Sequence, residues 1–373
     1  MTRVLSHDEA RLLRLRAQRL NPRWLERAAS VEQAVAESCG LQAQDAPAAR
    51  LSVRARTVGL TAADVERARL TDRSVVRTWC MRGTLHLVAA RDLGWLLPLL
   101  GPKFVAGRRG RYNELGLDED TCVRAVRSIG DMLAHRGPLT RAEIVEQLAA
   151  EGIRAEGQAG AHLVGRAALE GLVCLGPDRG AKNTYVLLAD WVDRGSSMDR
   201  ADAQAELARR YLAAYGPAEP DDLAAWSGLS LGEARAAWKR ITGELIDVTI
   251  AGRPAWMLAT RAAWLDELLS GEPLVRLLSS FDTYVLGHRS RDLILDPQYT
   301  KRFKRGGGML SPTLLVDGRV VGTWQVERHR DYQEIVVDPF NALAPQVQPG
   351  LEAEVADIAR FLGIKTALNV MTH

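Results

Sequence analysis

The sequence lacks the features of a membrane-bound or exported protein. No apolar run reaches the ~20 residues that a membrane-spanning helix needs, and no basic stretch followed by an apolar one precedes Ser6. Four scattered cysteines form no Cys-x-x-Cys pair and have no histidine at ligand spacing, so we expect reduced thiols in a reducing compartment. These absences predict a cytoplasmic protein without a membrane partner.

Motifs of several enzyme classes are also missing. The chain has no Gly-x-Ser-x-Gly nucleophile elbow and no Walker loop. Gly306-Gly307-Gly308 follows a basic run, but no strand pattern precedes it and no helix start follows, so a nucleotide cradle is not expected. Asp282, His288 and Asp292 carry metal-capable groups at a spacing that matches no standard zinc site. We therefore expect no bound metal and no cofactor.

Length and charge leave the partner open. The chain has 373 residues, which is too long for one hydrophobic core and predicts three or four modules. Its net charge of +3 does not by itself indicate a nucleic-acid partner. Clustered cations are more informative, because a basic stripe can hold phosphates while acidic residues elsewhere balance the total.

One arrangement of elements occurs twice: a helix, a Gly-Pro break, a capped helix, a second helix and a short β-hairpin. The first copy runs through Gly137-Pro138 to a hairpin over Cys174–Leu188. The second runs through Gly216-Pro217 and a helix over Ser230–Ile241 to a hairpin over Glu244–Leu258. Three short helices followed by a hairpin are typical of the winged-helix plan, which usually binds nucleic acid.

Capping signals mark where several helices begin. Ser or Thr followed three residues later by Glu or Gln is the capping-box pattern. The pairs with this pattern are Ser30/Gln33, Thr140/Glu143 and Ser230/Glu233, and Asp45 is expected to cap a helix from Ala46. The residues expected to face inward on the helix after Ser230 are Leu231, Ala234, Trp238 and Ile241.

A third copy of the arrangement is expected near the N-terminus. Its strands flank the turn Met81-Arg82-Gly83, and His86 on the second strand is expected to pack beside apolar neighbours. The expected helices cover Ser6–Leu20, Val31–Cys39, a stretch from Ala46, and Thr61–Leu70, and the expected strands are Ser74–Cys80 and Thr84–Val88.

The last hundred residues have a different, β-rich pattern. Thr313–Val316 and Val320–Trp324 flank Asp317-Gly318, which is a strong hairpin signal. A second hairpin is expected over Trp324–Val337, and a helix over Gly350–Leu362 is expected to end the chain. The predicted fold class is α+β, with three tandem winged-helix domains over residues 1–125, 126–195 and 200–272 and a β-rich C-terminal domain over residues 273–373.

Two glutamines stand out in the first module. Gln42 and Gln44 lie two residues apart in a connection that belongs to neither neighbouring helix. In an extended stretch such residues point the same way, so two carboxamides would converge, each with an acceptor oxygen and a donor NH₂. Glutamine is also common in ordinary connections, and helix capping already accounts for Asp45.

Four blocks of the sequence resemble one family. They are Leu41–Asp45, Arg77–Leu87, Ser280–Arg289 and Leu315–Trp324. The chain resembles, over nearly its whole length, the winged-helix DNA glycosylases of the AlkZ type, which excise alkylated purines or unhook crosslinks and protect producers of DNA-alkylating antibiotics.

The resemblance carries expectations about the site. In the crosslink-unhooking branch a Gln-x-Gln element marks the catalytic centre, and Gln42 and Gln44 occupy the matching positions, where a related branch has Gln-x-Asp. The family also implies a C-shaped array of three winged-helix units with a cationic channel. His288 and Arg289 are implied to face that channel near the lesion.

Cations in several clusters are expected to contact DNA, although for any single one a solvated surface residue is the alternative. The hairpin tip at residues 328–330 is either a minor-groove element or an ordinary exposed turn. The expected DNA-binding residues are Arg77, Arg82, Lys103, Arg108, Arg109, His288, Arg289, Arg291, Arg302, Lys304, Arg305, Arg328, His329 and Arg330.

These patterns together predict a monofunctional DNA glycosylase. A purine alkylated at N7 or N3 is already cationic and leaves without a strong general acid, so the enzyme's task is to hold water beside C1′ as the sugar gains positive charge. No lysine adjoins the glutamine pair, so strand cleavage through a Schiff base is not expected. The low aromatic content of 6% favours an open channel over a closed base-flipping pocket.

Two other functions remain open from the sequence. A non-enzymatic transcriptional regulator would use the same wings, but regulators are commonly symmetric dimers, whereas three different cassettes in one chain fit a monomer on one site. A scaffold whose winged helices bind proteins is the other. The expected partner is double-stranded DNA with alkylated purines, and both general repair and resistance to a genotoxic natural product are compatible with it.

Overall fold

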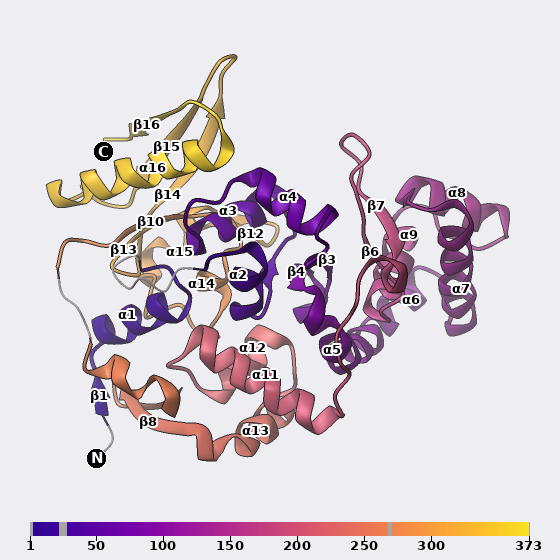
Figure 1. The fold of residues 1–373 in the computed structure, drawn as a ribbon, viewed down its shortest axis with the longest axis horizontal. Helices are drawn as coiled ribbons and strands as arrows, with labels where there is room; N and C mark the ends of the chain where they lie inside the picture. Colours follow the sequence, from indigo (N-terminus) through magenta and orange to yellow (C-terminus); the bar gives the residue numbers. More distant parts are fainter. Residues whose placement is uncertain (1–2, 22–27, 268–270, 373) are drawn as a thin grey trace. The chain divides into compact units, whose positions relative to one another are not determined.

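The computed structural model describes residues 3–21, 28–267 and 271–372 of an α+β protein (Figure 1). The chain forms two compact units. Unit 1 combines residues 1–65 with residues 205–373, and unit 2 consists of residues 66–204. The division falls inside helix α4 (Ala62–Leu70) and within the first predicted module, and the four module boundaries stay a prediction. None of the described helices is long and apolar enough to cross a membrane.

Capping residues begin several helices in unit 1, and those at Ser30, Asp45 and Ser230 are the predicted ones. Ser6 forms a full capping box with Glu9, and Asp45 caps α3 by accepting the amide of Ala48 at 3.0 Å. Gln33 departs from the predicted box, because its side chain accepts the amide of Ala29 instead. The helices of this unit are α1 (His7–Ala17), α2 (Val31–Glu37), α3 (Ala46–Arg56), most of α11 (Arg200–Tyr215), α12 (Pro220–Ser227) and α13 (Leu231–Arg240), with the short α14 (Thr283–Leu286) and α15 (Thr300–Phe303).

A three-stranded sheet follows α13. The predicted hairpin is formed by β8 (Leu245–Ile250) and β9 (Arg253–Leu258), and β1 (Arg3–Leu5) adds to β8 in parallel. Three residues are too few to show a strand periodicity, so β1 has no recognisable signal in the sequence. On α13 the prediction for Leu231 was wrong: it is 36% exposed, because it lies at the first position of the helix, before the inward face begins.

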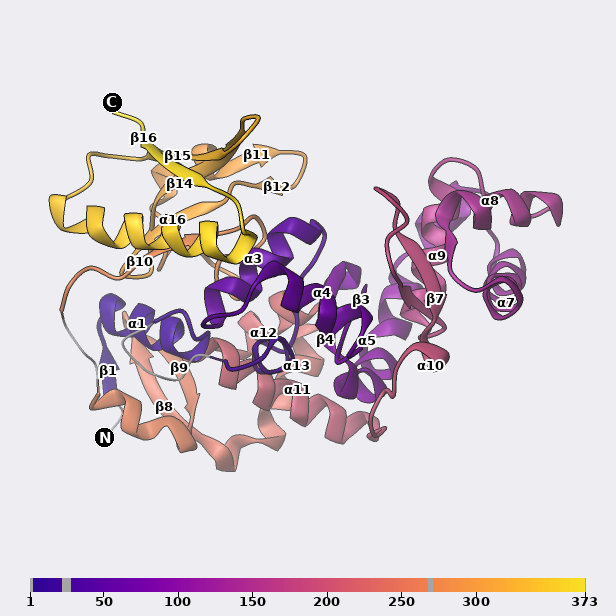
Figure 2. The same cartoon turned by 45° about the horizontal axis from the view of Figure 1, so that its top comes forward.

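The C-terminal part of unit 1 is a five-stranded sheet in the order β10-β13-β14-β15-β16. Both predicted hairpins are present, and α16 (Gln348–Leu362) packs along one face of the sheet, as two views show (Figures 1 and 2). The helix does not end the chain, because a last strand follows and pairs in parallel with β15. The strands are β10 (Val275–Leu278), β13 (Thr313–Val316), β14 (Arg319–Arg328), β15 (Gln333–Pro339) and β16 (Thr366–Val370), with a separate pair β11 (Lys304–Gly306) and β12 (Met309–Leu310).

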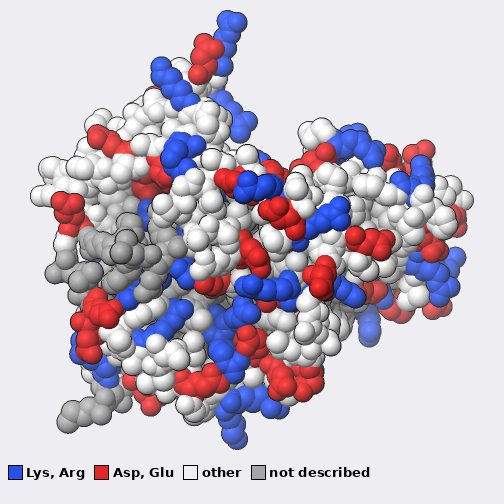
Figure 3. Space-filling model, in the orientation of Figure 1, with Lys and Arg blue, Asp and Glu red and all other residues white. Residues whose placement is uncertain are grey.

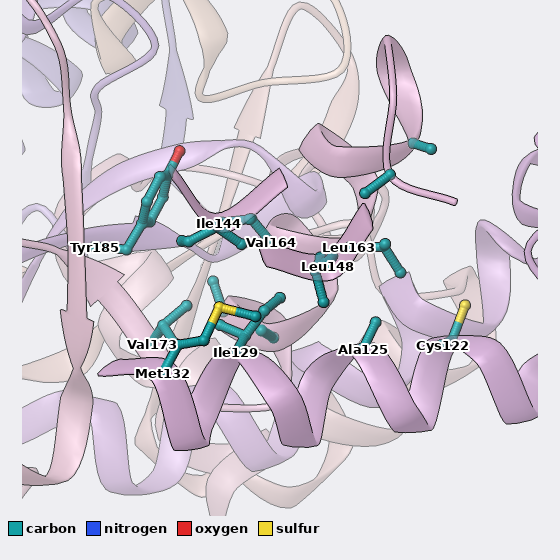
Figure 4. Packing of buried hydrophobic residues seen from close by; sticks show 14 of the residues in the cluster. Cys122, Ala125, Ile129, Met132, Ile144, Leu148, Leu163, Val164, Val173 and Tyr185 are labelled. Carbon is teal, nitrogen blue, oxygen red and sulfur yellow. The ribbon is translucent and has the colours of Figure 1, made fainter. Parts of the chain in front are cut away.

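Unit 2 has its own core between helices and a sheet in the order β4-β3-β6-β7-β5. Buried side chains such as Ile129, Leu148 and Leu163 come from three helices and meet Val173 of the sheet (Figure 4). The predicted Thr140/Glu143 capping box is confirmed. The elements are β3 (Val75–Trp79), β4 (Leu85–Ala89), α5 (Leu93–Gly107), α6 (Arg109–Glu114), α7 (Glu119–Arg136), β5 (Leu139–Thr140), α8 (Arg141–Ala150), α9 (Gln158–Leu169), β6 (Val173–Leu175), β7 (Thr184–Leu187) and α10 (Leu188–Trp191).

A buried charge cluster joins α3 to the C-terminal sheet and to α16. Arg54 donates to Glu354 at 2.9 Å and to the carbonyl of Leu277 at 2.9 Å, and Arg276 pairs with the other oxygen of Glu354. The amide of Leu277 donates to the same carboxylate at 2.9 Å. Burial alone would raise the pKa of Glu354, but the two arginines and this amide outweigh it and lower the pKa to about 2.

Replacing Glu354 by Gln is expected to destabilise the protein by about 3–5 kcal/mol, because two arginines stay buried with too little counter-charge. The folded protein keeps Glu354 ionised below its ordinary pKa of 4.5, so this stabilisation is complete above that pH and declines as the pH falls toward 2. Urea unfolding from pH 3 to 7 should therefore show a flatter pH profile for the variant. Glu352→Gln, which changes an exposed carboxylate on the same helix, should match the wild-type curve.

Two glycines with the same backbone angle allow a test of the β13–β14 turn. Gly318 and Gly252 both have φ +77°, but a Cβ at Gly318 would lie 2.6 Å from the hydroxyl oxygen of Tyr284, whereas one at Gly252 meets nothing within 4 Å. We expect Gly252→Ala to cost about 1 kcal/mol for the left-handed angle and Gly318→Ala about 2–4 kcal/mol, because overpacking is added. Equal losses in thermal unfolding would contradict the close packing of this turn against Tyr284.

Candidate active site

The segment with the two glutamines is a short connection between α2 and α3. The chain leaves α2 through Cys39 and Gly40, whose φ angles of +51° and +95° turn it sharply into β2 (Leu41–Gln42). Leu41 and Ala43 are fully buried, whereas Gln42 is 9% exposed and Gln44 is exposed. Leu41, Gln42 and Ala43 are thus all buried and only Gln44 reaches the surface, so burial along the stretch does not alternate and does not by itself place the two amides on one side.

Both ends of this segment are held by hydrogen bonds within unit 1. Before it, the hydroxyl of Tyr215 donates to the carbonyl of Ser38 at 3.0 Å. After it, Asp45 caps α3. Tyr215 is itself fixed, because its ring stacks on Tyr211 with centroids 5.0 Å apart and packs against Trp226. Nothing in the local sequence pattern indicates the Tyr215 contact, which joins residues 177 positions apart.

The aspartate of the Ser280–Arg289 block is part of the hydrophobic interior of unit 1. Asp282 is fully buried and binds Arg56 through two hydrogen bonds of 2.9 and 2.8 Å, and it also caps α14 at the amide of Tyr284. Burial would raise the pKa of Asp282, but Arg56 and the other donors lower it, so the carboxylate is ionised. This pairing agrees with the expectation that Asp282 is structural and not a metal ligand.

His288 is neutral in this environment. Its Nε2 donates to the carbonyl of Tyr215 at 3.0 Å, and burial, reinforced by nearby Arg14, lowers its pKa well below the ordinary value. The side chain lines a cavity of about 340 Å³ together with Glu219 and Asp222. His288 therefore contributes a hydrogen-bonding ring to this cavity rather than a positive charge. His86 in unit 2 is a packed strand histidine as expected, and burial lowers its pKa to about 3.

Three of the predicted DNA-binding cations come together in unit 1. Arg289, Arg291 and Lys304 line a cavity of about 600 Å³, which Arg253 also lines. Arg289 pairs with Asp221 at 3.0 Å, and Arg291 donates to a backbone carbonyl at 2.9 Å. The two remaining cations predicted between residues 289 and 305 contact their own neighbours: Arg302 binds Asp338 and lies over the ring of Phe340, and Arg305 donates to Ser311.

The predicted groove-binding tip projects from the C-terminal sheet between β14 and β15. Arg328, His329 and Arg330 are all exposed, and charged side chains gather at this end of the hairpin (Figure 3). The amide of His329 donates to the carbonyl of Tyr332 at 2.9 Å, and their rings stack with centroids 4.4 Å apart. The tip is therefore a closed turn with its cations directed to solvent.

One metal-capable group is not evident from the sequence. Ligand atoms of Glu327, His329 and Glu334 all lie within 4.8 Å of one another on the same hairpin. Glu334 pairs across the strands with Glu327, a relation that spacing along the chain does not reveal. All three side chains are at least partly exposed, and exposed acidic groups at such distances are common in proteins that bind no ion. We assign no metal to them.

The predicted cations of unit 2 come from strand β3, the turn after it, helix α5 and the junction of α5 with α6. Arg77 is buried and donates to Asn183 in the loop between β6 and β7 at 3.1 Å, and Arg108 donates to the carbonyl of Gly83 at 2.5 Å. Arg82 and Lys103 are partly buried, whereas Arg109 is exposed. Arg77 and Arg108 thus stabilise loops within their own unit, a role that the sequence did not indicate.

Comparison with known proteins finds relatives that match nearly the whole chain. The family described as DNA glycosylase AlkZ-like matches residues 35–361. The chain is 32% identical over 371 residues to the "Interstrand DNA cross-link repair glycosylase" of Streptomyces sahachiroi, covering 94% of this chain and 95% of that protein. A solved structure, Streptomyces sahachiroi DNA glycosylase AlkZ, aligns with a TM-score of 0.85 and 27% identity over 99% of this chain and 100% of that one.

The residues that match the family include the glutamine segment, the residues Ser38 and Asp45 at its two ends, and the buried Asp282. They also cover nearly all of the C-terminal sheet and the whole of unit 2. From this coverage, the chain belongs to the AlkZ-like family of DNA glycosylases.

Proposed function

We propose that this DNA glycosylase hydrolyses the N-glycosidic bond of cationic alkylated purines, such as N7-alkylguanine and N3-alkyladenine, and that Gln42 and Gln44 are its catalytic residues. The observation that carries the proposal is the geometry of their segment. It is an extended connection held at Ser38 on one side and at Asp45 on the other, with its apolar residues buried. A rigid segment is what oriented amides need in order to act as fixed dipoles.

The two amides are suited to positioning water rather than to proton transfer. Each carboxamide offers an oxygen that accepts and an NH₂ that donates, so two of them can hold one water molecule in a defined orientation. An uncharged amide is a poor base, so the substrate's own positive charge has to supply most of the driving force for bond cleavage. Positioning and preorganised dipoles then act on the step in which water meets the sugar carbon.

Three winged-helix modules would provide the DNA-binding surface. Support comes from the order α7, β5, α8, α9, β6, β7 in unit 2, where three helices precede a hairpin and β5 pairs with β7. The helices α11 to α13 with the hairpin β8–β9 repeat the same order. Predicted cations of the first module, such as Arg82, Lys103 and Arg109, and those of the C-terminal hairpin would contact phosphates, and one chain acting as a monomer would enclose one site.

Crosslinked or bulky lesions are the proposed wider substrate range. The curated relative is named as an interstrand cross-link repair glycosylase, and this chain has glutamine at both positions of the Gln-x-Gln element. A crosslinked base cannot leave the duplex to enter a closed pocket. The enzyme would therefore act on the nucleotide within an open channel, in repair or in resistance to a genotoxic natural product.

Changing both glutamines tests the assignment. Gln42→Ala with Gln44→Ala is expected to reduce release of 7-methylguanine from methylated duplex DNA to background, and each single change to cost about 100-fold, as for other preorganised dipoles. Chromatography of the freed base under single-turnover conditions gives the rate. Gln348→Ala, an exposed glutamine on α16, is the matched control and should act like the wild type. Undiminished release from the double variant would remove the pair from the mechanism.

Salt dependence tests the hairpin tip. Arg328→Ala with Arg330→Ala is expected to weaken duplex binding and to lower the slope of log affinity against log salt by about 1.8, because each phosphate contact contributes about 0.9. Fluorescence anisotropy at several salt concentrations measures both quantities. Arg124→Ala with Arg127→Ala removes the same charge from the exposed face of α7 and should leave the slope unchanged. A slope unchanged in the tip variant would exclude phosphate contacts there.

A further inference from the structure

A buried network of hydrogen bonds links the ion pair of Arg56 and Asp282 to the first turn of α3. Ser52 donates to Asp282 at 2.8 Å, and its oxygen lies 3.0 Å from that of Ser279. Ser279 in turn lies with its oxygen 2.8 Å from the carbonyl oxygen of Ala48. Ser52, Ser279 and Asp282 are each at most 3% exposed, so the network is shielded from water.

Counting hydrogens fixes the direction of these bonds. Ser52 has one hydroxyl hydrogen, and the ionised carboxylate of Asp282 is its strongest acceptor. At the contact between the two serines only Ser279 can then donate. The Ser279 hydroxyl donates to the carbonyl of Ala48, and the oxygen of Ser52 is the other acceptor within its reach. Arg56 keeps Asp282 ionised, so the charge pair determines where the Ser279 hydrogen points.

Ala48 connects this network to the glutamines. Its amide donates to Asp45, the residue directly after Gln44, and its carbonyl accepts from Ser279. A carbonyl in the first turn of a helix already has the amide four residues later as a partner, so the bond from Ser279 is additional. It is not required to satisfy the helix, and what it adds is a fixed position for the turn that starts at Asp45.

We propose that Ser279 is a positioning residue of the reaction, which holds the first turn of α3 and, through Asp45, the orientation of Gln44. The proposal rests on the catalytic role proposed for Gln42 and Gln44. Buried polar groups of this kind often add little net stability, because apolar packing could replace them. Their effect here is to fix where α3 begins relative to β10, from whose end Ser279 follows directly.

The test compares three serine variants of the full chain. Ser279→Ala should slow single-turnover release of 7-methylguanine about tenfold at saturating enzyme, as expected for a small misplacement of reacting groups, with duplex affinity unchanged. Ser227→Ala is the matched control, because Ser227 is also fully buried and its hydroxyl donates to a helix carbonyl, that of Leu223, at 2.6 Å. It should keep the wild-type rate.

The third variant separates positioning from general stability. Ser52→Ala removes a bond to a buried carboxylate, so it should lower the unfolding midpoint more than Ser279→Ala does. It leaves the Ser279 hydrogen free to point at Ala48, so its rate should fall less. If rate followed stability across the three variants, or if Ser279→Ala matched the wild type, the proposal would be overturned.

A second readout is independent of activity. Ser279→Ala should speed amide hydrogen exchange in residues 44–49 at least threefold while exchange in α12 stays unchanged, because only the first turn of α3 loses a contact. Unchanged exchange in residues 44–49 would also overturn the proposal. If the wild-type protein released no methylated base, the proposed reaction would fail, and the exchange result would still decide whether Ser279 holds this turn.

Discussion

The ion pair between Arg56 and Asp282 is the constraint on which unit 1 depends. Both side chains are completely buried and 226 positions apart, so the pair joins α3 to the start of α14, which follows β10. An unpaired charge at this depth would cost several kcal/mol. Arg54 repeats the arrangement two residues earlier through Glu354. Helix α3, which begins beside the glutamines, is thus held by two charge pairs. In the sequence, unit 2 is inserted between the two chain segments of unit 1 that these pairs connect.

Local signals account for what could be predicted of the fold. The caps at Asp45 and Thr140 and the turn at Asp317-Gly318 each depend on residues within four positions of one another. The local sequence pattern is therefore enough to locate them. The strands β1 and β16 pair with partners far away in the chain, and β1 has only three residues, too few to show a period. Burial of charge is equally non-local, which is why Arg77 was predicted as a DNA contact and lies buried against Asn183.

The candidate site shows the same difference between local sequence signals and contacts that join distant residues. Gln42 and Gln44 were chosen from their spacing and from a family resemblance, and these are properties of five consecutive residues. What keeps the segment in place comes from elsewhere: Tyr215 on α11 and Ser279 after β10. His288 is another case, since burial and the nearby Arg14, which its local sequence does not reveal, lower its pKa well below the ordinary value. Groups suited to the chemistry are recognisable from the sequence, whereas the groups that position them are not, because those contacts join distant parts of the chain.

The choice of amides over acids has a structural reason in this segment. Asp45 is the one carboxylate in residues 41–45, and the cap of α3 already uses it. Its carboxylate is turned toward the amide of Ala48, at the start of the helix. In the mechanism proposed above, the two glutamines of this segment act as fixed dipoles, so bond cleavage has to draw on charge that the lesion brings. In the same proposal, selectivity for cationic bases needs no tight pocket, and an enzyme without one can tolerate bulk on the damaged base.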